Sequence, residues 1–148
     1  REIMLIAEYD VVFLDSNGVR RMRAGAKAPT LIAKLPVDHK LLWATRNNIV
    51  TATPAGEFAH WGWDSATGVA GPATTLKSPV AVTLLELWGL NADDLYATGA
   101  DGIVLNFDGR SWRVVPMPTK VRLNCMTGAF GTLWIAGDGG TLLRYGRL

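Results

Sequence analysis

Two histidines and a single cysteine are the residues of this 148-residue sequence that most often carry chemistry. Nucleophilic catalysis needs a base within hydrogen-bond reach of a nucleophile, and neither His39 nor His60 accompanies a motif such as G-x-S-x-G. Cys125 has no second cysteine to pair with, so we expect a buried structural thiol. The run Gly137-Asp138-Gly139-Gly140 lacks the Lys and Ser/Thr of a phosphate loop and predicts a hairpin turn. We therefore expect no enzyme activity, no cofactor and no metal site.

Three arginines near the start of the chain form a basic cluster, Arg20, Arg21 and Arg23. Closely spaced guanidinium groups can bind phosphate or an acidic protein surface. Arginine also protects an outer, solvated strand from pairing with another chain. The cluster is therefore a candidate binding surface, and a solvated outer strand is the alternative interpretation.

A second candidate binding surface is aromatic and comprises His60, Trp61 and Trp63. The period-2 alternation of a strand places Phe58 and His60 on one face and the two tryptophans on the other. Exposed indole rings would stack on sugars or on aromatic side chains of a partner. Buried rings would instead fill the space between neighbouring repeats.

The best-defined structural unit is the stretch from Leu95 to Val115, in which glycine turns separate three short β-type runs. Glycine supplies the positive φ that hairpin turns require. Pro116 ends the third run because it cannot donate to a strand ladder. We expect Asp108, before Gly109, to accept backbone N–H bonds within its own turn, with Trp112 packed beneath that turn.

The same unit occurs four times at a period of about forty residues, which is typical of propeller blades. The equivalent leucines are Leu5, Leu42, Leu95 and Leu133. The predicted fold is all-β: a β-propeller-like array of about four blades, complete or half of a larger or oligomeric propeller. We divide the single domain into repeats at approximately 1–27, 28–78, 79–118 and 119–148.

Particular segments have particular places in these repeats. Thr30 to Ala33 is expected to be the innermost strand of the second repeat, and Ser65 to Ser78 an inserted surface loop. One repeat position carries an aromatic residue in three copies, and we expect its ring to lie in the packing between blades: Trp43, Tyr96 and Trp134.

The third repeat resembles the blades of Asp-box propellers through Gly99, Gly102, Asp108-Gly109 and Trp112. Similar blades occur in bacterial propellers related to the photosystem II assembly and stability factor, which are often grouped with WD-repeat or BNR-like proteins. An Asp box usually reads S-x-D-x-G-x-T-W, and here Asn106 stands for the Ser and Ser111 for the Thr. The resemblance implies a propeller protein of bacterial or phage origin.

Composition limits the kinds of partner. The net charge of +2 is too small a surplus to argue for nucleic-acid binding. No run approaches the roughly 18 apolar residues of a membrane helix, so we expect no membrane insertion. The hydrophobic content of 49% and mean hydropathy of +0.15 fit a protein whose sheet faces are covered by a partner.

The two terminal repeats are incomplete in the predicted arrangement. The last repeat lacks an outer strand, and the first lacks an innermost strand before Ile3. Because unpaired sheet edges invite association, we predict a non-enzymatic protein-interaction or scaffold module in a larger assembly. Its edges would be completed by a protein partner, a second copy or a missing part of a longer chain. The alternative is a glycan-binding module that uses inter-blade aromatic clefts with Trp61, Trp63 and Tyr96, and a sialidase-like enzyme is a third hypothesis.

Overall fold

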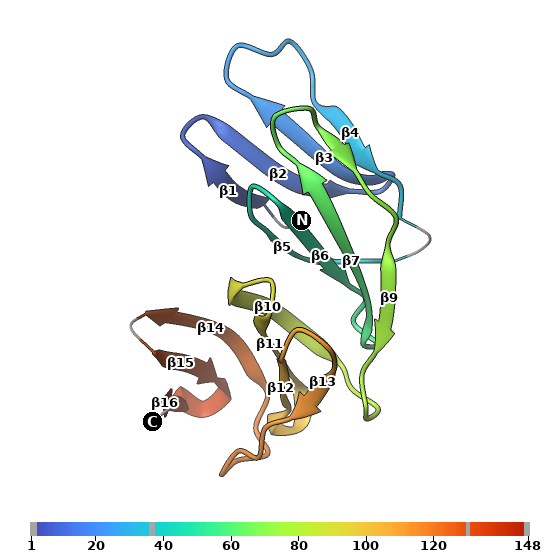
Figure 1. Cartoon of the computed structure of the whole chain (residues 1–148). Coiled ribbons are helices and arrows are strands. Elements are labelled where there is room, and N and C mark those ends of the chain that lie inside the picture. Colours follow the sequence, from blue (N-terminus) through green and yellow to red (C-terminus); the bar gives the residue numbers. More distant parts are fainter. Residues whose placement is uncertain (1–2, 36–37, 130, 147–148) are drawn as a thin grey trace. The chain divides into compact units, whose positions relative to one another are not determined.

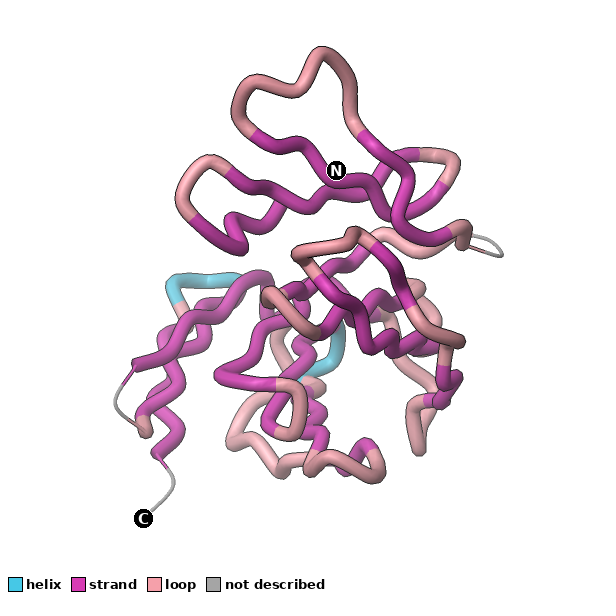
Figure 2. Tube along the Cα trace, turned by 45° about the horizontal axis from the view of Figure 1, so that its top comes forward, coloured by secondary structure: helices cyan, strands magenta, loops and turns pink. Residues whose placement is uncertain are grey.

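The computed structural model describes residues 3–35, 38–129 and 131–146. These residues form two compact units: the first consists of the described residues within Arg1–Thr53 and Glu57–Thr75, and the second of those within Pro54–Gly56 and Leu76–Leu148. Strands dominate both units (Figure 1). The only helical elements in the described ranges are two three-residue 3-10 turns, coloured cyan in Figure 2. The all-β prediction is confirmed.

The first sheet of the first unit is a four-stranded antiparallel meander. Its strands, in spatial and chain order, are β1 (Ile3–Ala7), β2 (Asp10–Asp15), β3 (Gly18–Arg23) and β4 (Thr30–Ala33). A tight hairpin joins β2 to β3, because the Asp15 carboxylate accepts the N–H groups of Asn17 and Gly18 at 2.7 and 3.1 Å. Asp15 and Gly18 then face each other across the ladder.

Three expectations about the first half of the chain are wrong. The segment Thr30–Ala33 pairs with β3, with Ala33 opposite Val19, so it is the last strand of the first sheet and not the innermost strand of the second. It also brings the first sheet to four strands, where we expected one to be missing. The segment 65–78, expected to be a loop, contains β8 and β9.

The second sheet of this unit follows the same meander. Its strands are β5 (Leu41–Ala44), β6 (Asn48–Ala52), β7 (Glu57–Asp64) and β8 (Val69–Ala70), with β9 (Thr74–Lys77) paired to β7. The two sheets share one core, because alternate residues of each strand point toward the other sheet. The buried residues of this core are Val12, Leu14, Val19, Leu42, Ala44, Ile49, Ala59, Trp61 and Trp63.

The second unit also contains two sheets. The third sheet of the chain consists of β10 (Leu84–Asn91), β11 (Asp94–Gly99), β12 (Val104–Phe107) and β13 (Trp112–Val114). The fourth consists of β14 (Leu123–Ala129), β15 (Thr132–Gly137) and β16 (Leu142–Gly146). Within the described residues this last sheet has three strands, as the sequence predicted.

The third and fourth sheets are structural repeats of each other. Each begins with a buried leucine, Leu84 or Leu123, opposite a glycine, Gly99 or Gly137, and an irregularity in register follows at once. Each glycine leads into a 3-10 turn, η1 (Ala100–Gly102) or η2 (Asp138–Gly140). In both copies the N–H after the glycine donates at 2.9 Å to the carbonyl before the leucine, on Thr83 or Arg122. Positions can therefore be equated residue by residue.

Candidate protein-binding surface

The basic cluster is neutralised within the first unit. Arg21 is 7% exposed, its guanidinium donates from Nε to the Asp10 carboxylate at 2.8 Å, and a second nitrogen contacts the other carboxylate oxygen. The hydrogen bonds from Arg21 hold the pKa of Asp10 below its usual value. The Arg21 guanidinium also lies 5.1 Å from the centre of the Trp63 ring, a cation–π contact.

The other two arginines are engaged as well. Arg20 forms an ion pair with Asp15, and Arg23 donates to the carbonyl oxygens of Ser65 and Ala66. β3 lies between β2 and β4, so the alternative interpretation of the cluster, a solvated outer strand, is wrong. The arginines act mainly within the fold, and Arg21 is buried in it.

The tryptophans of the aromatic cluster are core residues. Trp61 and Trp63 are 6% and 5% exposed, and the indole N–H of Trp63 donates to the Thr45 carbonyl at 2.8 Å. These rings do not form the exposed stacking platform that a glycan site would need. They fill the space between two sheets, which was the other interpretation of the sequence.

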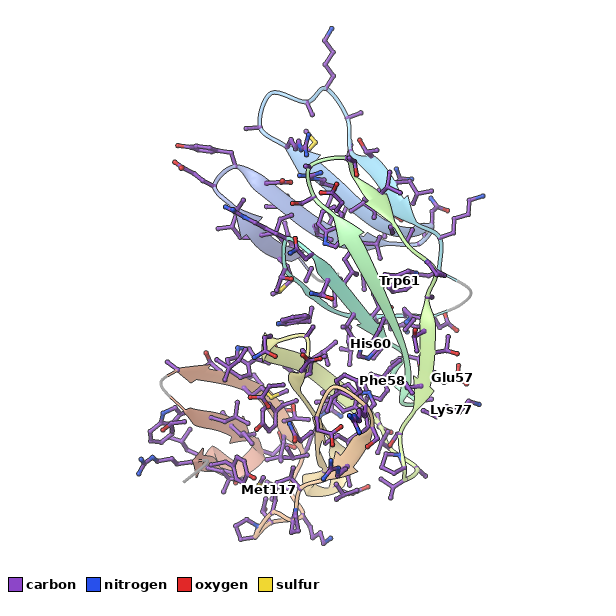
Figure 3. The ribbon with its side chains drawn as sticks, viewed as in Figure 1. Glu57, Phe58, His60, Trp61, Lys77 and Met117 are labelled. Carbon is purple, nitrogen blue, oxygen red and sulfur yellow. The ribbon has the colours of Figure 1, made fainter. Side chains whose placement is uncertain are left out.

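His60 precedes Trp61 on β7 (Figure 3), and strand alternation puts the two side chains on opposite faces, as predicted. Burial lowers the pKa of His60 to about 4, so the imidazole is neutral at physiological pH. His39 accepts or donates a 2.7 Å hydrogen bond with the Thr51 hydroxyl, and burial lowers its pKa as well.

The turn around Asp108 has the predicted chemistry. Its carboxylate accepts the N–H groups of Arg110 and Ser111 at 3.0 and 2.9 Å. Gly109 has φ = 89°, and a Cβ there would come within 2.9 Å of the Asp93 carboxylate. Trp112 is 5% exposed, with its ring centre 5.3 Å from that of Phe107. This turn is a structural element of the third sheet.

The aromatic cleft between the third and fourth sheets is too small for a sugar. Tyr96 lines it together with Trp88 and Tyr145, and its ring centre lies 6.3 Å from that of Tyr145. The cavity volume is ≈ 30 Å³, space for about one or two water molecules. The rings pack one sheet on the next, and the glycan-binding alternative has no support.

One face of the last sheet is open and carries large side chains. The register places Trp134 beside Thr127 and Arg144, and Ala136 between Cys125 and Leu142. Trp134 is 43% exposed and Leu142 64% exposed. We call Cys125, Thr127, Trp134, Leu142 and Arg144 the open face of the last sheet. Trp134 and Cys125 were both expected to be buried, and both expectations are wrong.

In the third sheet the face equivalent to this open face is covered by a neighbouring sheet. Counting back from the equivalent glycines, Tyr96 corresponds to Trp134 and Val104 to Leu142. Tyr96 is 4% exposed and Val104 fully buried, because both pack against the fourth sheet. Trp43, at the predicted counterpart in the second sheet, is 3% exposed. The sequence did not identify the open face because it shows the repeat but not which copy lacks a neighbour.

Other kinds of site are not evident in the described parts of the chain. Nowhere in residues 3–35, 38–129 and 131–146 do three His, Cys, Asp or Glu side chains gather closely enough to hold a metal ion. No helix among those residues is long and apolar enough to span a membrane.

Comparison with known proteins supports the fold. No known family model matches the chain. It is 34% identical over 79 residues to "Immune protein Tsi7" of Pseudomonas aeruginosa strain PAO1, a match that spans 53% of this chain and 25% of that protein. A solved structure, "YCF48 bound to D1 peptide", superposes on 99% of the chain with a TM-score of 0.61 at 10% identity. The fold is β-propeller-like. The chain spans only 53% of that solved propeller chain.

Proposed function

We propose that this chain is a non-catalytic protein-binding module and that its partner covers the open face of the last sheet. The observation that carries the proposal is the difference between two equivalent positions. Tyr96 and Val104 are buried by a neighbouring sheet, whereas Trp134 and Leu142 stand in solvent.

The composition of the open face suits a protein partner. Tryptophan and arginine are the residues most enriched among those that dominate binding energy at protein interfaces. Here Trp134 lies directly beside Arg144 on the neighbouring antiparallel strand. A shallow hollow of ≈ 410 Å³ adjoins them, lined also by Thr127, Gly128 and Thr132. A flat sheet surface with one hollow fits a protein surface better than a small ligand.

The similar proteins point the same way. The solved propeller is bound to a peptide, and the partial relative is named an immune protein. A protein that confers immunity without catalysis does so by binding the harmful agent. We propose that this chain works in that manner, with a protein as the agent or as a fellow member of the assembly.

Site-specific photo-cross-linking tests this proposal. p-Benzoylphenylalanine would replace Trp134 in one variant and Val69, which is 66% exposed in the first unit, in a control variant. We expect ultraviolet irradiation of producing cells to link position 134 to a defined protein and position 69 to none. Mass spectrometry identifies the linked chain. Equal, diffuse cross-linking from both positions would contradict the proposal.

A further inference from the structure

We propose that the surface covering the open face of the last sheet belongs to a second copy of this chain, namely the outer face of that copy's first sheet. This inference rests on the proposed function, since it names the partner for the same face. It makes the protein a head-to-tail dimer in which each copy uses two different surfaces.

The first sheet has an open apolar face of its own. Directly opposed residues of an antiparallel pair lie on the same face, and the register pairs Ile3 with Phe13, Leu5 with Val11 and Val11 with Met22. We call these five residues the open face of the first sheet. Ile3 is 65% exposed and Leu5 69% exposed, and the other three are half-buried.

The opposite side of the first sheet is already occupied. Val12 and Leu14 alternate with the residues of the open face and pack against Leu42 and Ile49 of the second sheet. The first sheet therefore uses one face for the sheet that follows it in the chain. Its other face corresponds to the side on which a preceding sheet would pack.

The last sheet is covered on one face and open on the other. It packs on the third sheet through Leu133 and Ile135, which face Tyr96, so its inner face serves the sheet before it. Its open face is the side on which a following sheet would pack. In both units a side chain such as Tyr96 or Val12 meets aliphatic residues of the next sheet. The open face of the first sheet offers such aliphatic residues to Trp134.

Charge favours this pairing over contact between two identical faces. Self-pairing of the open face of the last sheet would bring two Arg144 side chains into one interface, where like charges are costly. On the open face of the first sheet, Arg20 lies opposite Phe13 and is neutralised by Asp15. Arg144 would therefore meet a surface without net positive charge.

The proposed contact joins two unlike faces, and each copy carries one of each. A contact between two unlike faces makes a closed assembly or a growing filament. The assembly closes as a dimer when the open face of the last sheet in each copy covers the open face of the first sheet in the other copy.

Analytical ultracentrifugation of the full chain and its charge variants tests the inference. We expect the wild-type protein to have twice the 16.0 kDa mass of one chain. Leu5→Lys and Trp134→Glu should each raise the dimer dissociation constant by about tenfold or more, because each places a charge in the interface. Val69→Glu, at an exposed position elsewhere, should leave it unchanged. Circular dichroism verifies that each variant is folded. Ile3→Lys and Leu142→Glu form a second pair of variants, one on each open face, for which we expect the same result.

Mixing the two variants distinguishes head-to-tail contact from self-pairing. An equimolar mixture of Leu5→Lys and Trp134→Glu chains should form dimers again, because one of the two contacts is intact and the other pairs Lys with Glu. If Leu5→Lys alone left the dimer intact, the contact would not involve the first sheet and the inference would be wrong. A monomeric wild-type chain would overturn it too. If position 134 still cross-linked to a different protein, the proposed function would stand while this inference failed.

Discussion

Tyr96 and Trp134 occupy the same position in successive sheets, yet Tyr96 is 4% exposed and Trp134 is 43% exposed. The difference arises because Tyr96 packs against the fourth sheet. We expect Tyr96→Ala to lower the free energy of unfolding by about 3–5 kcal/mol, the usual cost of removing a buried aromatic ring. Trp134→Ala should cost about 1 kcal/mol or less.

Urea unfolding of the dilute, dissociated chain compares these two variants directly. Dilution matters because association would add to the apparent stability. A large loss of stability in dissociated Trp134→Ala would show that this ring is held within the chain's own fold.

The Arg21–Asp10 pair is expected to stabilise the first unit. Arg21→Ala removes both hydrogen bonds to the buried Asp10 carboxylate, which keeps only the Arg23 guanidinium at 3.9 Å, and uncovers the Trp63 ring. Breaking one side of such a pair costs about 3–5 kcal/mol. Arg20→Ala is the matched control, since Arg20 pairs with Asp15 where both side chains are partly exposed, and such pairs contribute about 0–1 kcal/mol. Similar losses in the two variants, measured by urea unfolding, would argue against a buried pair at Arg21.

Gly128 is required by the ring of Trp88. A Cβ at Gly128 would lie 2.5 Å from Cη2 of Trp88 and 3.0 Å from the Thr132 carbonyl oxygen. Gly128→Ala should therefore destabilise the packing of the third sheet on the fourth by about 1–3 kcal/mol. The change should appear in near-ultraviolet circular dichroism and thermal unfolding. Gly146→Ala, in the same sheet with open space around the new methyl group, should behave as wild type.

Stability should fall in mildly acidic solution because of His60. Its pKa drops from the ordinary 6.5 to about 4 on folding, so between these values the unfolded chain binds a proton that the folded chain does not. The stability is fully present above pH 6.5 and decreases until about pH 4, by at most on the order of 3 kcal/mol. Urea unfolding at pH 7.5, 5.5 and 4.5 should give a shallower pH dependence in His60→Gln than in wild type.

Two further variants separate this effect from other titrations. His39→Gln reports the contribution of the second histidine, whose pKa burial lowers in the same direction. The carboxylates of Asp10, Asp15 and Asp64 have lowered pKa values, so their contribution is lost below about pH 4, under the His60 window. An unchanged pH dependence in His60→Gln would contradict the assignment.

Local patterns predicted much of this structure. The alternation of Phe58 and His60 with Trp61 and Trp63, and the turn chemistry of Asp108, depend on neighbours in sequence and were correct. The sheet to which Thr30–Ala33 belongs was not predictable in this way, because a short apolar strand can pair in either of two adjacent sheets. Its pairing with β3 places it in the first sheet.

The exposure of Arg21 and of Trp134 also depends on contacts with other parts of the chain, so it was not predictable from neighbours in sequence. Arg21 reads as a surface residue, and its burial depends on Asp10, eleven residues away, and on Trp63 of another sheet. Trp134 reads as a core residue because its repeat counterparts are core residues. Its exposure depends on the absence of a fifth sheet next to the described residues of the fourth.

Oxidative footprinting of Trp134 in intact cells measures most directly whether another protein covers the open face of the last sheet. Trypsin releases Trp134 on the peptide from Leu123 to Arg144, where it is the sole tryptophan, and fragmentation separates its oxidation from that of Met126. We predict that hydroxyl radicals oxidise Trp134 several-fold more slowly in producing cells than in the purified, diluted chain, while Tyr9, 71% exposed in the first unit, reacts equally in both. Equal oxidation of Trp134 in the two samples would show that the face is free and would contradict the central claim.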